Sequence, residues 1–122
     1  YGDDPDNNFD SLIKTKAKLV KIPLRNNQIN LSFFVSHLEE YGLNNLLVEA
    51  GPKLTASVIE AGYYDDLIIY IAPILLGSDA NNLVKLTQIK NIRQKIQFSF
   101  EDIRQIGPDL RVTLRAKKND LN

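Results

Sequence analysis

The most hydrophobic stretch of the chain limits how it can fold. Residues 67–76 read Leu-Ile-Ile-Tyr-Ile-Ala-Pro-Ile-Leu-Leu and include no charged side chain. A short, unbroken apolar run is typical of a strand that is covered on both faces, as in a sheet lying between helices. We therefore predict a central strand over residues 66–76. Regular pairing should stop near Pro73, because proline cannot donate a hydrogen bond to a neighbouring strand.

Strands and helices alternate before this central strand. The patterns predict a strand over residues 18–24, a polar turn over 25–28, a helix over 31–41, a strand over 46–48 and a second helix starting at Pro52. Asn30 is a good N-cap for the first helix, and Gly42 supplies its left-handed C-terminal residue. Pro52 suits the first position of a helix, where its missing N–H would be unpaired anyway. Gly62 ends this second helix.

Both ends of the chain have a different character. Residues 1–12 are acidic and rich in turn-forming residues, so we expect a loop or a disordered end. Residues 77–92 are polar and irregular. The alternating runs 96–103 and 110–116, joined through Gly-Pro-Asp, predict an antiparallel pair. The expected fold class is α/β, with a mixed, largely parallel sheet, flanking helices and a C-terminal antiparallel hairpin.

Composition excludes several functions. Fifteen basic residues balance fifteen acidic ones, so no general field attracts nucleic acid or an anionic membrane. No segment approaches the ~20 apolar residues of a membrane span. With no Cys and one His, the chain cannot assemble a disulfide, a zinc site or a Cys/His catalytic site. We expect a cytoplasmic protein that binds no metal. Because the chain has no Met, we also expect it to be a piece of a longer protein.

Residues 48–55, Val-Glu-Ala-Gly-Pro-Lys-Leu-Thr, combine several functional requirements. A predicted strand ends here, Gly51 lets backbone approach a ligand, and a helix begins whose free N–H groups can bind phosphate. Thr55 and Ser57 add hydroxyl groups, and Glu49 adds a carboxylate that can accept hydrogen bonds from ribose hydroxyls or an amine. Two alternatives stay open: the junction is merely structural, or Glu49 pairs with a surface Lys. The glycine spacing matches neither the dinucleotide fingerprint nor the phosphate loop.

The sequence around this junction resembles a known family. "LLVEAGPKLTASVIEAGYYDDLIIYIAPILLGSDA" and the closing "FSFEDIRQIGPDLRVTL" are similar to the reductase domain of the bifunctional riboflavin-biosynthesis deaminase/reductase, over about residues 18–116. The resemblance implies a partial dihydrofolate-reductase-like fold. It also implies NADPH-dependent reduction of the ribosyl group of 5-amino-6-(5-phosphoribosylamino)uracil to ribityl. Residues 1–122 would then be the C-terminal portion of one reductase domain whose upstream part is absent.

The resemblance also assigns residues. It implies that Glu49 contacts the phosphoribosylaminopyrimidine substrate. The NADPH site would be lined by Gly51, Pro52, Lys53, Leu54, Thr55, Ala56 and Ser57. Lys53 departs from the small polar residue commoner in the family, and we expect it to point to solvent. No catalytic acid is identifiable. Without the upstream half, the chain alone is expected to be weakly active or inactive.

Two other functions remain open at this stage. The chain could be a non-catalytic module that dimerises through an edge of its terminal hairpin, and a homodimer is also what the family resemblance implies. Alternatively, it could belong to a related reductase acting on another pterin- or pyrimidine-like substrate. His37 lies beside the apolar stripe of its predicted helix and is given no catalytic role. The pair Asp65 and Asp66 is interpreted as an exposed strand entry.

Overall fold

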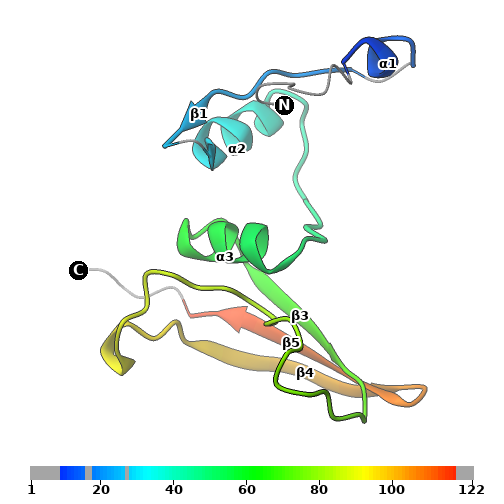
Figure 1. The fold of residues 1–122 in the computed structure, drawn as a ribbon, viewed down its shortest axis with the longest axis vertical. Helices are drawn as coiled ribbons and strands as arrows, with labels where there is room; N and C mark the ends of the chain where they lie inside the picture. Colours follow the sequence, from blue (N-terminus) through cyan, green and yellow to red (C-terminus); the bar gives the residue numbers. More distant parts are fainter. Residues whose placement is uncertain (1–8, 16–17, 27, 118–122) are drawn as a thin grey trace. The chain divides into compact units, whose positions relative to one another are not determined.

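The computed structural model describes residues 9–15, 18–26 and 28–117 (Figure 1). The chain divides into two compact units, residues 1–47 and residues 48–122. Within the described residues, no helix is both long enough and apolar enough to cross a membrane. Each unit has its own secondary structure.

The first unit contains short elements. They are α1 (Phe9–Ile13), β1 (Leu24–Arg25), β2 (Gln28–Ile29) and α2 (Leu31–Glu39). β1 and β2 form an antiparallel hairpin, and Asn26 in its turn has a φ of 53°. α1 occupies residues for which a loop was predicted, while residues 1–8 lie outside the described part. The predicted strand over 18–24 is wrong except at Leu24. Pro23 lacks an N–H, so ladder pairing starts only after it.

α2 confirms the predicted first helix and both of its end signals. The Asn30 side chain accepts a hydrogen bond from the backbone N–H of Phe33 at 3.2 Å, as an N-cap does. Gly42 follows the helix with a φ of +65°, in the left-handed region where glycine is favoured. His37 contacts Glu40 at 3.0 Å, and its ring contacts the rings of Phe33, on the same helix, and Tyr41, just after the helix ends.

The second unit combines one helix with a three-stranded sheet. Its elements are α3 (Pro52–Glu60), β3 (Asp66–Ile71), the 3-10 turn η1 (Ile92–Gln94), β4 (Phe98–Ile106) and β5 (Asp109–Ala116). The strand order is β3-β5-β4, and both pairings are antiparallel. Pro52 starts α3 and Gly62 follows its end, as predicted. The terminal hairpin is also confirmed, with an irregularity between Phe100 and Asp102.

The parallel part of the predicted sheet is not found among the described residues. Residues 43–51 form no strand, and Leu47 is 75% exposed. Without a strand at 46–48, the helix α3 does not connect two parallel strands. β3 therefore lies at the edge of the sheet, paired with β5 on one side, rather than at its centre. It ends at Ile71, before Pro73, as predicted. The part of the predicted fold class that is confirmed is a small α/β fold, and its sheets are antiparallel.

A small core holds the second unit together. Ala56 and Ile59 of α3 are buried, and Val112 at the middle of β5 is 6% exposed. Ile59, Leu67 of β3 and Phe98 of β4 line one pocket, so α3 lies beside the sheet. The connection from β3 to β4 passes along the same helix (Figure 1). This packing sets the position of the α3 start, where the candidate site was predicted.

Candidate functional site

The start of α3 presents unpaired backbone donors. Gly51 is the N-cap, with φ −70° and ψ 170°, and no side chain caps the helix. Within the described part of the chain, the N–H groups of Lys53 and Leu54 have no hydrogen-bond acceptor. Both residues are exposed. Two free donors at the positive end of a nine-residue helix are suited to an anion.

Gly51 leaves open space at this helix start. No heavy atom lies within 4 Å of the position that a Cβ would take. Its φ is one that any residue adopts, so the backbone here does not require glycine. A side chain at an N-cap extends toward the N–H groups of the first helical turn, so a larger residue here would compete with a ligand for them. The open space is therefore available to a ligand.

The hydroxyl groups of the junction are already used as donors. Thr55 Oγ1 donates to the carbonyl oxygen of Ala50 at 3.2 Å, and Ser57 Oγ donates to the carbonyl of Lys53 at 3.1 Å. Their oxygens remain available only as acceptors. Ala56 is 3% exposed and packs in the core. The predicted stretch is thus divided between exposed residues at the helix start and residues that hold the helix in place.

Glu49 lies in the exposed segment just before α3. Among the described residues, its carboxylate forms no ion pair, so the alternative pairing with a surface Lys is not found. Lys53 is likewise exposed and without a carboxylate partner in that part of the chain. Glu49 and Lys53 thus precede and follow Gly51 in the chain, and both are exposed. Their roles in binding substrate and cofactor stay predictions.

Sequence reasoning missed a second feature of α3, at its other end. The Glu60 carboxylate accepts hydrogen bonds from the backbone N–H groups of Thr87, at 2.5 Å, and Gln88, at 2.9 Å. The Lys85 N–H also donates to the Pro52 carbonyl at 3.1 Å. We call residues 84–89 the strap, because these bonds hold the segment along the helix. The partners are 27 and 28 residues from Glu60, so no local pattern predicts them.

These contacts shift the acidity of Glu60. Its pKa lies below the ordinary value of 4.5, chiefly because the Gln88 N–H and then the Thr87 N–H donate to the carboxylate.

The sheet also carries ion pairs. Asp66 pairs with Arg115 at 3.0 Å, which agrees with an exposed strand entry, and Asp102 pairs with Arg104 at 2.6 Å. No cluster of His, Cys, Asp and Glu suited to a metal occurs among the described residues.

Comparisons with known proteins agree with the sequence resemblance. RibD of Escherichia coli is 40% identical over 94 residues, which are 77% of this chain and 26% of that protein. The 5-amino-6-(5-phosphoribosylamino)uracil reductase of Buchnera aphidicola from Acyrthosiphon pisum is 33% identical over 126 residues, covering 88% of this chain and 61% of the relative. A solved structure of Acinetobacter baumannii RibD matches with a TM-score of 0.66 and 25% identity.

The extent of these matches is informative. The Acinetobacter structure covers 81% of this chain, while the chain covers 27% of that protein. The chain thus spans about a quarter of the length of the RibD relatives it matches. The RibD C-terminal domain family matches residues 6–112, which include α3, the strap and most of the sheet. The chain therefore belongs to the RibD C-terminal domain family.

Proposed function

We propose that the protein carrying this chain is an NADPH-dependent reductase of riboflavin biosynthesis. It reduces the ribosyl group of 5-amino-6-(5-phosphoribosylamino)uracil to ribityl in the cytoplasm. The Buchnera relative, which is named for this activity, and the family membership support the proposal. The observation that carries it is the α3 start, where the Lys53 and Leu54 N–H groups have no acceptor among the described residues and Gly51 leaves open space.

The residues at this helix start fit the phosphates of a dinucleotide. The Lys53 and Leu54 N–H groups donate to a phosphate oxygen, and the positive end of α3 favours its charge. The Lys53 ammonium adds a charge near the same point. Thr55 Oγ1 accepts a hydrogen bond from a ribose hydroxyl, since its own proton is held by Ala50. Pro52, Ala56 and Ser57 keep the helix in position. NADPH supplies the hydride, and the protein orients the two reactants.

Glu49 is proposed as the substrate-binding residue. Its carboxylate has no ion-pair partner in the described part of the chain and lies two residues before Gly51. A free carboxylate accepts hydrogen bonds from neighbouring hydroxyls of the ribosyl chain or from the ring amine. In this arrangement, one side of Gly51 holds the substrate and the other holds the cofactor phosphates. The same geometry would serve a related reductase acting on another pyrimidine-like compound.

We also propose the dihydrofolate-reductase-like mixed sheet for the intact domain. The support is that residues 46–48 are apolar, lack a strand partner and are exposed, as is typical of a strand whose neighbours are missing. A homodimer is the second part of this proposal. β4 is an edge strand, and it carries the exposed side chains of Phe100 and Ile103. If the chain were only a dimerisation module, light scattering would detect a dimer while no cofactor bound.

The test is a calorimetric titration of the protein with NADPH, with NADH for comparison. We expect saturable binding that favours NADPH. Gly51→Val should weaken NADPH binding by at least about tenfold, because losing charge-assisted hydrogen bonds costs roughly 1.5–3 kcal/mol. Gly51→Ala should have a smaller effect because a methyl group occupies less of the space. Equal affinities for all three proteins, with unchanged circular dichroism, would reject the assignment of the cofactor site.

A further inference from the structure

The second unit contains an apolar pocket away from the proposed reductase site. Its volume is about 480 Å³, within the range of pockets that hold small molecules. Apolar side chains make up most of its wall, including Ile59 of α3, Leu67 of β3, Ile89 of the strap and Phe98 of β4. Ile59 is seven residues from Pro52, or roughly 10 Å along the helix. None of residues 49–57 lines the pocket, although Val84 and Leu86 in its wall flank Lys85, whose N–H donates to the Pro52 carbonyl.

The segment that supplies most of the lining residues of this pocket is unusually basic. Residues 80–100 contain four cations, Lys85, Lys90, Arg93 and Lys95, and no Asp or Glu, although the whole chain has no net charge. Lys90 and Lys95 line the pocket. Neither of them is paired with a carboxylate in the described part of the chain. The pocket wall thus combines apolar side chains with two lysines that have no carboxylate partner among the described residues.

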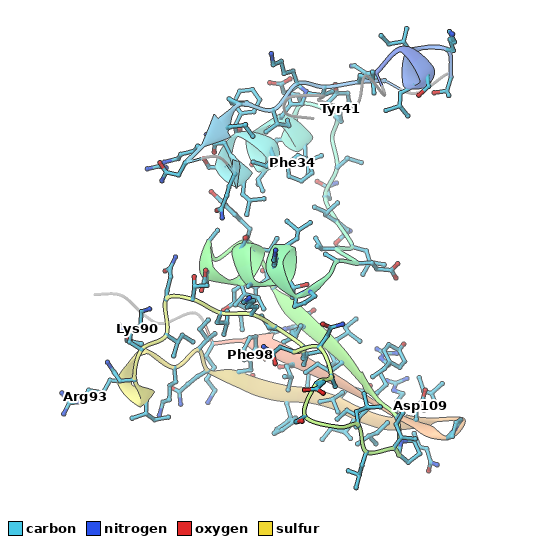
Figure 2. All side chains as sticks on the ribbon, viewed as in Figure 1. Phe34, Tyr41, Lys90, Arg93, Phe98 and Asp109 are labelled. Atoms are coloured by element: carbon cyan, nitrogen blue, oxygen red, sulfur yellow. The ribbon has the colours of Figure 1, made fainter. Side chains whose placement is uncertain are left out.

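Hydrogen bonds hold the segment that carries these lysines. Asn91 and Gln94 form a capping box around η1, in which Gln94 Oε1 accepts from the Asn91 N–H at 3.2 Å. The same oxygen also accepts from the Lys90 N–H at 2.7 Å. Glu60 holds the strap through Thr87 and Gln88. Figure 2 shows Lys90 and Arg93 on this segment, with the Arg93 side chain directed away from the sheet. A site whose backbone is already ordered loses less entropy when a ligand binds.

We propose that this pocket binds a small amphipathic carboxylate, with its apolar body inside and its carboxylate on Lys90 and Lys95. Charge complementarity selects the anion, since two lysines in the wall of one apolar pocket favour a ligand with a negative head group. The apolar wall selects the body, because a sugar phosphate would leave polar groups without partners there. The ligand is a free small molecule rather than a membrane lipid. This site is separate from the proposed reductase site, and NADPH does not compete for it.

The test uses decanoate as the probe and decanol as its uncharged match. Decanoate should bind the full chain saturably, with the amide signals of Ile89 and Ile92 shifting in heteronuclear NMR spectra. An exposed charge contact changes affinity by up to about fivefold, so the double variant Lys90→Gln/Lys95→Gln should bind roughly tenfold more weakly. Arg93→Gln, which removes a charge outside the pocket, should change the affinity less than twofold. Saturating NADPH should leave all these values unchanged.

Several results would overturn the proposal. Decanol binding as tightly as decanoate would show that the lysines do not select an anion. Equal affinity in the double variant would lead to the same conclusion. A dimer that dissociates when decanoate is added would identify a second copy as the occupant, and tighter binding to phosphatidylglycerol vesicles would identify a membrane. If the double variant fails to fold, Ile96→Trp, which adds bulk to the pocket wall outside the strap, should abolish decanoate binding while preserving NADPH binding.

Discussion

Glu60 offers the sharpest test of how the strap is held. Glu60→Gln keeps the shape of the side chain but removes its charge. In the structure, one carboxylate oxygen of Glu60 accepts hydrogen bonds from the Thr87 and Gln88 N–H groups at 2.5 and 2.9 Å. A charged acceptor makes hydrogen bonds about twice as strong as a neutral one. Because the carboxylate is partly exposed, we expect the weaker hydrogen bonds of Glu60→Gln to lower the free energy of unfolding by about 1 kcal/mol in total.

A second effect of the same substitution has the opposite sign. Glu60 is the last residue of α3, where a negative charge meets the negative end of the helix dipole. Removing that charge should raise the free energy of unfolding by about 0.3–0.5 kcal/mol. Glu39 is the matched control, because it is the last residue of α2 and has no hydrogen-bonded strap among the described residues. Glu39→Gln should therefore raise the free energy of unfolding slightly, whereas Glu60→Gln should lower it by about 0.5 kcal/mol.

Hydrogen exchange is the assay that reads the strap directly. The Thr87 and Gln88 amides should exchange about fivefold faster in Glu60→Gln, which corresponds to about 1 kcal/mol. Amides of β5, which are held by the sheet, should change less. Urea unfolding then gives the difference between the two Gln variants. If Glu60→Gln and Glu39→Gln shift exchange and unfolding equally, the carboxylate does not hold the strap.

The pH dependence of this protection has a definite sign. The pKa of Glu60 is lowered in the folded protein, first by the Gln88 N–H and next by the Thr87 N–H. A lowered pKa means that stability is present above the unfolded value of about 4.5 and is lost as pH falls through the folded value. Protection of the two amides should hold from neutral pH to about pH 5 and decline below the ordinary pKa. Glu60→Gln should show no such decline.

Four further substitutions test the fold and the proposed site. Gly51→Ala should change the free energy of unfolding by less than about 0.5 kcal/mol, because the φ of Gly51 is ordinary and the space around it is open. Gly62 has a φ of +76°, so Gly62→Ala should lower the free energy of unfolding, measured in urea, by about 1–2 kcal/mol. Glu49→Ala should raise the Michaelis constant for the pyrimidine substrate well above its effect on NADPH affinity, and equal effects in steady-state kinetics would argue against a substrate contact. Val112→Ala should cost roughly 2 kcal/mol by thermal unfolding, because it empties a buried site in the central strand.

The edge position of β3 shows where sequence reasoning stopped. Its apolar run correctly predicted a strand and a stop before Pro73. The same run predicted cover on both faces and neighbours on both sides, yet β5 is the hydrogen-bonded partner found among the described residues. An apolar pattern indicates that both faces of a strand are covered in the complete fold. It does not say which segments meet that requirement, because the partners come from distant parts of the chain.

The candidate site divides in the same way. Gly51, Pro52 and the helix they begin could be predicted, because caps and proline positions act over a few residues of backbone. Two other features could be seen only in the structure. Thr55 donates a hydrogen bond to the Ala50 carbonyl, and the Lys53 and Leu54 N–H groups have no acceptor among the described residues. The function inferred from the resemblance is a further step, since the chain covers about a quarter of the RibD relatives.

By itself, the sequence determined the family, the helices that follow Asn30 and Gly51, and the terminal hairpin. These features depend on short-range signals, such as a capping side chain, a positive φ at glycine or an alternating strand. Only the tertiary structure decided the strand order β3-β5-β4, the strap on Glu60 and the pocket lined in part by Lys90 and Lys95. Each of these depends on contacts between residues that are far apart in the chain. Such contacts are selected by the packing of the whole unit, and local conformational preferences do not encode them.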